Sequence, residues 1–109
     1  MSNVPSITVE QLRDMLASGA PPFVLDVREP HENEICKLPG SALIPLGSLP
    51  QRLGEVPKDK TIVVHCHHGG RSSRAVAWLL QQGYANVFNL SGGIHAWSLK
   101  IDPEVKTYG

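Results

Sequence analysis

The segment from Cys66 to Ser72 brings together residues that could support a reactive thiol. It reads Cys-His-His-Gly-Gly-Arg-Ser, so a thiol, two imidazoles and a guanidinium lie close together in the chain. Cysteine acts as a nucleophile only as the thiolate, and a free thiol with a pKa of about 8.5 is only a few per cent ionised at neutral pH. A nucleophilic role for Cys66 therefore requires neighbouring groups that stabilise negative charge on its sulfur.

Three features of this segment favour a thiolate. A helix predicted to begin at Ser72 would present unpaired backbone N–H groups and the positive end of its dipole. The guanidinium of Arg71 adds a full positive charge. The pair Gly69-Gly70 allows a tight turn in which successive N–H groups converge on one anion. These residues predict an anion-binding cradle around a nucleophilic Cys66, rather than a small hydrophobic residue at the end of a strand.

His67 and His68 are expected at the rim of this cradle. Either imidazole could donate a hydrogen bond, or carry positive charge if a neighbouring anion raised its pKa, and the sequence leaves both roles open. Metal binding by His65, Cys66, His67 and His68, with or without Cys36, is an alternative because thiolate and imidazole suit zinc and copper. Four consecutive residues cannot all converge on one ion without severe backbone distortion, so the sequence predicts no metal centre.

Strands that alternate with helices are expected to position this segment. Short apolar runs rich in β-branched residues predict strands, and apolar residues at helical spacing next to capping signals predict helices. The predicted strands cover 23–27, 42–44, 61–65 and 86–90, and the predicted helices start at Thr8 and cover 30–35, 48–54, 72–82 and 92–97. The alternation predicts an α/β fold with a mainly parallel sheet and helices on both faces.

The predicted strand over 61–65 places the reactive segment at the edge of the sheet where ligands bind. This strand is apolar on both faces, so it belongs at the centre, and sites in such sheets lie beyond the carboxyl ends of the strands. Asp26 and Arg28 end a neighbouring strand, where they could face the same loop or pair with each other, and we favour pairing. His65 points opposite to Cys66 by pleat alternation, so a structural role is expected.

Length and charge limit the classes of protein. A chain of 109 residues with 41% hydrophobic residues is expected to form one domain over 1–109, with a core over about 5–100 and a loosely packed tail over 101–109. Ten basic residues balance ten acidic ones, so no overall field favours nucleic acid or a membrane surface. No apolar stretch reaches the roughly 18 residues of a membrane span. Without a secretory-signal pattern, and with two cysteines, a cytoplasmic location is expected.

On these motifs the sequence resembles the rhodanese family. The active-site loop of that family, Cys-x-x-Gly-x-Arg-Ser, matches Cys66, Gly69, Arg71 and Ser72. Two further parts are similar to family signatures: Asp-Val-Arg-Glu at 26–29 with the Leu-Pro-Gly and Ile-Pro-Leu segments up to 46, and Gly-Gly-Ile-His-Ala-Trp at 92–97. The resemblance spans almost the whole chain. One departure is Cys36-Lys37, where the family commonly has Gly-His.

The resemblance implies a fold and a reaction. The fold would be a five-stranded parallel sheet with helices on both sides and the active-site loop after the central strand. Cys66 would attack the outer sulfur of thiosulfate or a related small anion, release sulfite and hold the sulfur as a persulfide, with no metal or organic cofactor. Of the loop residues expected to bind the anion, Gly69, Arg71 and Ser72 match the family motif, whereas His67, His68 and Gly70 are expected from the chemistry of the loop itself. The acceptor would be a thiol or cyanide, with thioredoxin or a sulfur-accepting biosynthetic enzyme as partner.

Two other classes compete with this interpretation. Cysteine phosphatases and arsenate reductases also direct loop amides and an arginine at an oxyanion beside a thiolate, but they place the arginine six positions after the cysteine. Arg71 is five positions after Cys66, and the smaller ring suits a sulfur atom better than a phosphate group. Noncatalytic rhodanese-like interaction modules lack the cysteine, so the presence of Cys66 favours the enzyme.

Overall fold

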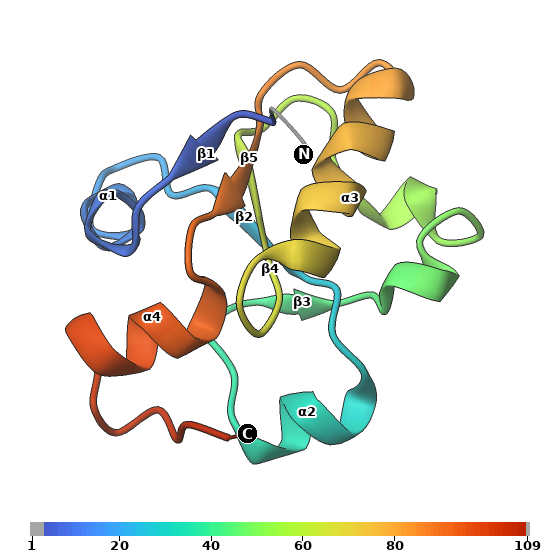
Figure 1. Cartoon of the computed structure of the whole chain (residues 1–109). Helices are drawn as coiled ribbons and strands as arrows, with labels where there is room; N and C mark the ends of the chain where they lie inside the picture. The colour runs from blue at the N-terminus through green and yellow to red at the C-terminus, as the bar shows by residue number, and fades with distance from the viewer. Residues whose placement is uncertain (1–3, 109) are drawn as a thin grey trace.

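The computed structural model describes residues 4–108, in which the chain forms a five-stranded parallel sheet (Figure 1). The strand order is β1-β5-β4-β2-β3, and each neighbouring pair is parallel. The strands are β1 (Ser6–Ile7), β2 (Phe23–Asp26), β3 (Ala42–Leu43), β4 (Ile62–His65) and β5 (Val87–Leu90). The prediction that the strand before Cys66 is central is confirmed. Strand β1 was not predicted, because two residues are too few to show an alternating pattern.

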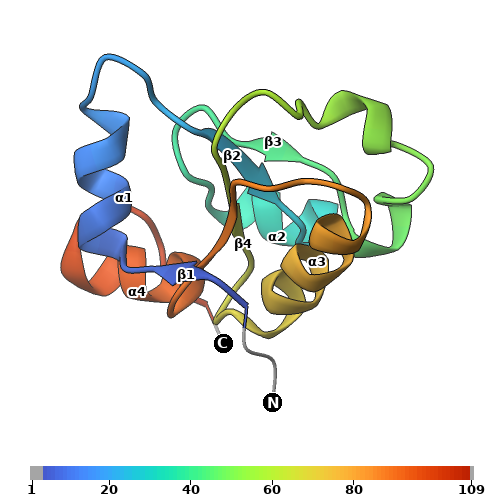
Figure 2. The ribbon, with the colours of Figure 1, turned by 90° about the horizontal axis from the view of Figure 1, so that it is seen from above.

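Helices cover both faces of the sheet, as predicted. They are α1 (Val9–Leu16), α2 (Pro30–Ile35), α3 (Gly70–Gln81) and α4 (Gly93–Lys100). Figure 2 shows α1 and α4 on one side of the sheet and α3 on the other. The predicted start of α1 is confirmed by a capping box, in which Thr8 Oγ1 accepts from the Gln11 N–H (3.1 Å) and Gln11 Oε1 accepts from the Thr8 N–H (2.8 Å).

The helix predicted over 48–54 is instead two short 3₁₀ turns. These turns are η1 (Leu46–Ser48) and η2 (Leu53–Glu55), on either side of Pro50. Because Pro50 has no N–H, it cannot donate to the carbonyl of Leu46, and η1 cannot continue through Pro50 as an α-helix.

Two hydrophobic clusters fill the space between the sheet and its helices. Alternate residues of β4 contribute to different clusters: Val64 packs with Ala75 and Val76 of α3, whereas Val63 packs with Leu12 of α1 and with Ile94 of α4. Cys66 belongs to the cluster on the α3 side, two residues beyond Val64. The pleat of β4 therefore directs the Cys66 side chain toward the helix that begins four residues later.

The tail, expected to be loosely packed over 101–109, is half-buried or exposed over the described residues 101–108, and a few of these residues anchor it. Three of its apolar residues, Ile101, Val105 and Tyr108, pack against the cluster on the α1 and α4 side. The Tyr108 hydroxyl also donates a hydrogen bond to Glu32 Oε2 (2.8 Å). The expectation of looseness rested on Pro103, but the apolar residues around it give the segment a surface to bury. No helix within residues 4–108 is long and apolar enough to cross a membrane.

Candidate active site

The sulfur of Cys66 lies where several donors converge, as the sequence predicts. Its Sγ accepts hydrogen bonds from the backbone N–H groups of Gly69 (3.1 Å) and Ser72 (3.4 Å) and from the Ser72 hydroxyl (3.4 Å). These groups belong to the loop after β4 and the first turn of α3. The side chain is only 2% exposed, so the donors surround the sulfur closely. An incoming molecule must approach from the rim, where His68 and Gly70 are exposed.

The cradle favours the ionised form of this thiol. Burial raises the pKa of Cys66, but hydrogen bonds from the Ser72 side chain and from the backbone N–H groups of Ser72, Gly69 and Arg71 lower it, and the net pKa falls below its usual value. Burial is the largest single effect, but the hydrogen bonds to the charged form together outweigh it.

Gly69 gives the loop its shape. Its φ of 123° lies in the left-handed region that side chains rarely adopt, so the turn requires glycine here. Gly70 needs no such freedom, since it is the first residue of α3, has no positive φ and is exposed. Of the two glycines expected to form the turn, the structure therefore assigns that role to Gly69.

A second glycine pair, which the sequence indicated only as a helix start, fixes the loop from outside. Gly92 and Gly93 both have positive φ, at 80° and 62°. A Cβ on Gly93 would clash with the carbonyl oxygens of Cys66 and His67. This close approach lets the Ile94 N–H donate to the Cys66 carbonyl (3.0 Å) and the His95 N–H to the His67 carbonyl (3.1 Å). Helix α4 thus satisfies two backbone acceptors of the reactive loop.

Asn89 on β5 is a further site residue that sequence reasoning missed. Its carboxamide forms a short hydrogen bond with the Ser72 hydroxyl, and both side chains are buried. A hydroxyl carries one hydrogen, which serves one acceptor at a time. The Ser72 hydroxyl therefore donates either to Asn89 Oδ1 or to Cys66 Sγ at any one time, and the two backbone N–H groups are the constant donors to the sulfur.

Arg71 reaches a carboxylate at the edge of the site. Its two terminal nitrogens bind the two oxygens of Glu32 at 2.7 and 2.8 Å, in a bidentate pair from α3 to α2. The Arg71 guanidinium holds the pKa of Glu32 well below its usual range, against the effect of burial. Attraction to Cys66 also contributes to the raised pKa of Arg71, after the larger contribution of Glu32. The positive charge of Arg71 therefore acts on the Cys66 thiol while it is also paired with Glu32.

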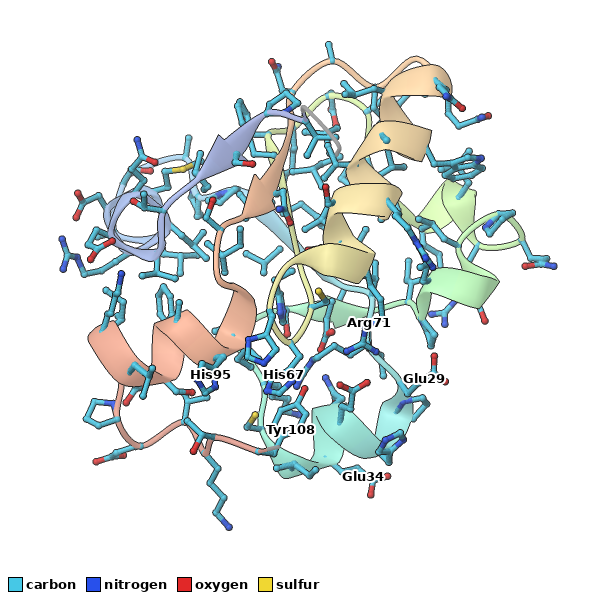
Figure 3. The ribbon with its side chains drawn as sticks, in the orientation of Figure 1. Glu29, Glu34, His67, Arg71, His95 and Tyr108 are labelled. Atoms are coloured by element: carbon cyan, nitrogen blue, oxygen red, sulfur yellow. The ribbon has the colours of Figure 1, made fainter. Side chains whose placement is uncertain are left out.

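Tyr108 links this pair to the buried ion pair of Asp26 and Arg28. Its hydroxyl donates to Glu32 and accepts from Arg28 Nη1 (3.0 Å). Figure 3 shows Tyr108, Arg71 and His67 converging between α2 and α4. Burial of the hydroxyl is the largest cause that raises the pKa of Tyr108 to about 12, so the side chain stays neutral and can donate. No sequence motif connected Glu32 or Tyr108 to the site, because both arrive by tertiary packing.

Asp26 and Arg28 form the pairing that we favoured over a direct role at the loop. Both are fully buried, and Asp26 accepts from Arg28 Nε (2.9 Å) and Nη2 (2.7 Å). Arg28 also donates to the backbone carbonyls of Cys36 (2.7 Å) and Glu32 (3.3 Å), so it holds the C-terminal end of α2. Burial raises the pKa of Asp26, but the hydrogen bonds and charge of Arg28, together with His65, bring it below its usual value.

The remaining residues singled out in the sequence have distinct surroundings. His65 is fully buried, and burial lowers its pKa to about 4, so the ring is neutral at physiological pH. Cys36 is buried and free, accepts a weak hydrogen bond from Arg28 (3.8 Å), and packs in the cluster opposite to that of Cys66. Trp97 is 5% exposed and packs in the hydrophobic core. His67 and His68 lie beside each other, with ring centroids 4.0 Å apart.

Known proteins resemble this chain along most of its length. The Rhodanese-like domain model matches residues 8–100. The "Sulfurtransferase" of Allochromatium vinosum is 40% identical over 95 residues, which cover 87% of this chain and 89% of that protein. The "Probable adenylyltransferase/sulfurtransferase MoeZ" of Mycobacterium tuberculosis is 37% identical, but the matched region, 94% of this chain, spans only 27% of that protein. The crystal structure of a Rhodanese-like domain protein from Staphylococcus aureus has a TM-score of 0.83 at 30% identity, covering 96% of this chain and 99% of that one.

Proposed function

Because this chain belongs to the rhodanese-like domain family, we propose that it is a sulfurtransferase that takes sulfur from a thiosulfate-like anion and carries it as a persulfide on Cys66. The observation that carries the proposal is the position of Cys66 Sγ, which accepts hydrogen bonds from Gly69 and Ser72 at the start of α3. These donors stabilise negative charge on sulfur, and the lowered pKa of the thiol is their consequence.

The reaction balances in two steps. The Cys66 thiolate attacks the outer sulfur of thiosulfate, the sulfur–sulfur bond of the donor breaks, and its electron pair leaves with sulfite. The enzyme then holds a persulfide anion. An acceptor thiolate or cyanide attacks the terminal sulfur and restores the Cys66 thiolate. Negative charge stays within the same ring of N–H donors in both steps, so preorganised donors stabilise each transition state without reorganising.

Mass spectrometry of the intact protein after incubation with thiosulfate tests this proposal. We expect the mass to rise by one sulfur atom, located on the peptide that contains Cys66, and to return to its original value when cyanide is added. In parallel, hydrolysis of phenyl phosphate is measured for the phosphatase alternative. A protein that hydrolyses phenyl phosphate and gains no sulfur would contradict sulfur transfer and favour a phosphatase.

Replacement of Arg71 by alanine is expected to raise the KM for thiosulfate by about tenfold, with a smaller change in kcat. Arg71 supplies a cation near Cys66, and one charge-assisted hydrogen bond contributes about 1.5–3 kcal/mol. Steady-state kinetics with cyanide as acceptor measure the change. Arg74→Ala is the matched control, because Arg74 is exposed on the same helix. An unchanged KM in Arg71→Ala would show that Arg71 serves only to hold Glu32.

Alkylation of Cys66 is expected to have a midpoint below about pH 8.5, measured in a Cys36→Ser background so that one thiol reacts. The pKa of the Cys66 thiol is lowered in the folded protein. The thiolate fraction and the alkylation rate therefore reach their plateau at a lower pH than in the unfolded chain. Rates of reaction with iodoacetamide across pH 5–10 give the midpoint. The same protein in concentrated urea is the control, and should return the midpoint to about 8.5. An alkylation midpoint at or above about pH 8.5 in the folded protein would contradict the proposal that the Cys66 thiolate is activated.

The sulfur acceptor and the cellular location of the protein are predictions. Relatives include the adenylyltransferase/sulfurtransferase MoeZ and the "Putative sulfur carrier protein YrkF" of Bacillus subtilis. By this similarity we propose that a thiol, thioredoxin or a sulfur-accepting biosynthetic enzyme receives the sulfur in the cytoplasm.

A further inference from the structure

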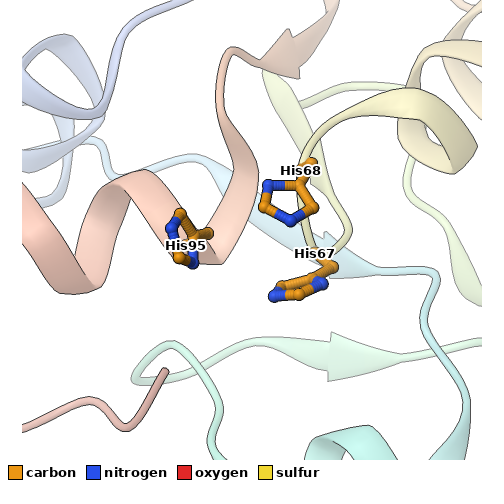
Figure 4. Close-up of side chains that lie close together, drawn as sticks. All are labelled: His67, His68 and His95. Atoms are coloured by element: carbon orange, nitrogen blue, oxygen red, sulfur yellow. The ribbon is translucent and has the colours of Figure 1, made fainter. Parts of the chain in front are cut away.

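Three histidines gather beside the reactive loop. His67 and His68 follow Cys66 directly, and His95 lies in the first turn of α4. Each offers a ring nitrogen, and these nitrogens all lie within 4.8 Å of one another (Figure 4). The ring centroids of His68 and His95 are 4.8 Å apart, and those of His67 and His95 are 5.6 Å apart. Residues far apart in the chain thus present three imidazoles to one point.

Two nitrogens of this cluster are buried without a hydrogen-bond partner in the described structure. They are Nε2 of His67 and Nδ1 of His95. A buried polar atom without a partner costs about 1–3 kcal/mol, so such atoms call for an explanation. An ion bound between the rings would supply the missing partner for both.

The cluster is held in place from outside. The N–H of His95 donates to the carbonyl of His67 (3.1 Å), which fixes the start of α4 against the loop. The ring of His67 stacks on Tyr108, with centroids 4.0 Å apart and planes 11° apart. This stack fixes the plane of the His67 ring, and with it the position of the unpartnered Nε2.

We propose that His67, His68 and His95 form a binding site for a divalent transition-metal ion of the zinc type. Imidazole suits zinc, and three histidines leave a fourth position for water, which can enter where His68 is exposed. Tetrahedral coordination at about 2.0–2.1 Å puts nitrogens about 3.4 Å apart, so the farthest pair must close by about 1.4 Å through ring rotation.

His95 explains why the sequence did not predict this site. The expectation of no metal considered ligands only from 65–68 and Cys36, which cannot converge. The site needs two loop residues and one from α4, and the contact at Gly93 brings them together. The inference does not rest on the proposed sulfur transfer, since none of its ligands is the thiol.

Calorimetric titration of Zn²⁺ into the full chain, without a polyhistidine tag, tests the site. We expect one ion per protein, and at least about tenfold weaker binding in His95→Ala and in His68→Ala. His31→Ala is the matched control, because His31 is exposed on α2 outside the cluster, and Cys66→Ser is the control for the thiol. Both controls are expected to bind Zn²⁺ as the wild type does, and circular dichroism checks that each variant is folded.

The visible absorption of bound Co²⁺ gives a second measurement. Histidines that only stabilise the fold would not produce this absorption. We expect visible absorption of tetrahedral Co²⁺ in the wild type and in Cys66→Ser, and none in His95→Ala. The inference is overturned if no Zn²⁺ binds, if His95→Ala binds as tightly as the wild type, or if Cys66→Ser removes the binding. Sulfur loading by thiosulfate is measured separately, so each proposal can fail without the other.

Discussion

Replacement of Cys66 by serine is expected to reduce sulfur transfer from thiosulfate by at least about a thousandfold, because the variant has no atom on which a persulfide can form. The serine oxygen can still accept hydrogen bonds from Gly69 and Ser72, so the loop should keep its conformation. Sulfite release, measured with cyanide as acceptor, gives the rate, and thermal unfolding gives the stability.

The second cysteine of the chain provides the matched control. Cys36→Ser makes the same chemical change at a buried thiol in the other hydrophobic cluster. It is expected to retain most of the transfer activity, since the one side-chain hydrogen bond that Cys36 makes within residues 4–108 is a long one from Arg28. Retained transfer in Cys66→Ser, or loss in a folded Cys36→Ser, would refute the assignment of the nucleophile.

Replacement of Arg28 by methionine is expected to lower the free energy of unfolding by about 3–5 kcal/mol. The guanidinium is fully buried and pairs with Asp26, whose side chain is 0% exposed. Its removal leaves an unpaired buried charge and takes donors from the carbonyls of Glu32 and Cys36. Domains of this size have about 5–15 kcal/mol in total, so the variant should be close to unfolding. Urea denaturation measures the change.

An exposed arginine and a double variant separate the buried charge from the size of the side chain. Arg13 pairs with Asp14 at the surface, where the side chains are 53% and 73% exposed. Arg13→Met is expected to change stability by no more than about 0.5 kcal/mol. Arg28→Met combined with Asp26→Leu should be more stable than Arg28→Met alone, because no charge is left unpaired. A loss in Arg28→Met no larger than in Arg13→Met would show that the pair does not hold α2.

Local sequence patterns predicted most of the fold because the residues that start and stabilise each element are neighbours in the chain. The capping box at Thr8, the apolar run of β4 and Pro30 at the start of α2 each depend on neighbours in the chain. The two differences from the prediction, strand β1 and the segment 48–54, also have local causes. Strand β1 is too short to show a pattern, and Pro50 separates two 3₁₀ turns where the apolar spacing predicts one helix.

The site was predicted only in part, because half of it is built by contacts across the chain. The segment from Cys66 to Ser72 contains its thiol, its turn and its N–H donors in sequence, so the cradle was visible. Glu32, Asn89 and Tyr108 carry no motif, and each reaches the site from a different element. The partner of Arg71 was therefore missed, and so was the histidine that joins His67 and His68 from α4.

The contact between Gly93 and the reactive loop makes the site a late product of folding. Cys66 and Gly93 are separated by α3 and β5, and the carbonyls of Cys66 and His67 find their donors only after both elements have docked. A partly folded chain in which α4 has not docked would leave both carbonyls without these donors, and the loop would lack this support. Protection of the Ile94 and His95 amides from hydrogen exchange during refolding would then mark the moment when α4 docks against the loop.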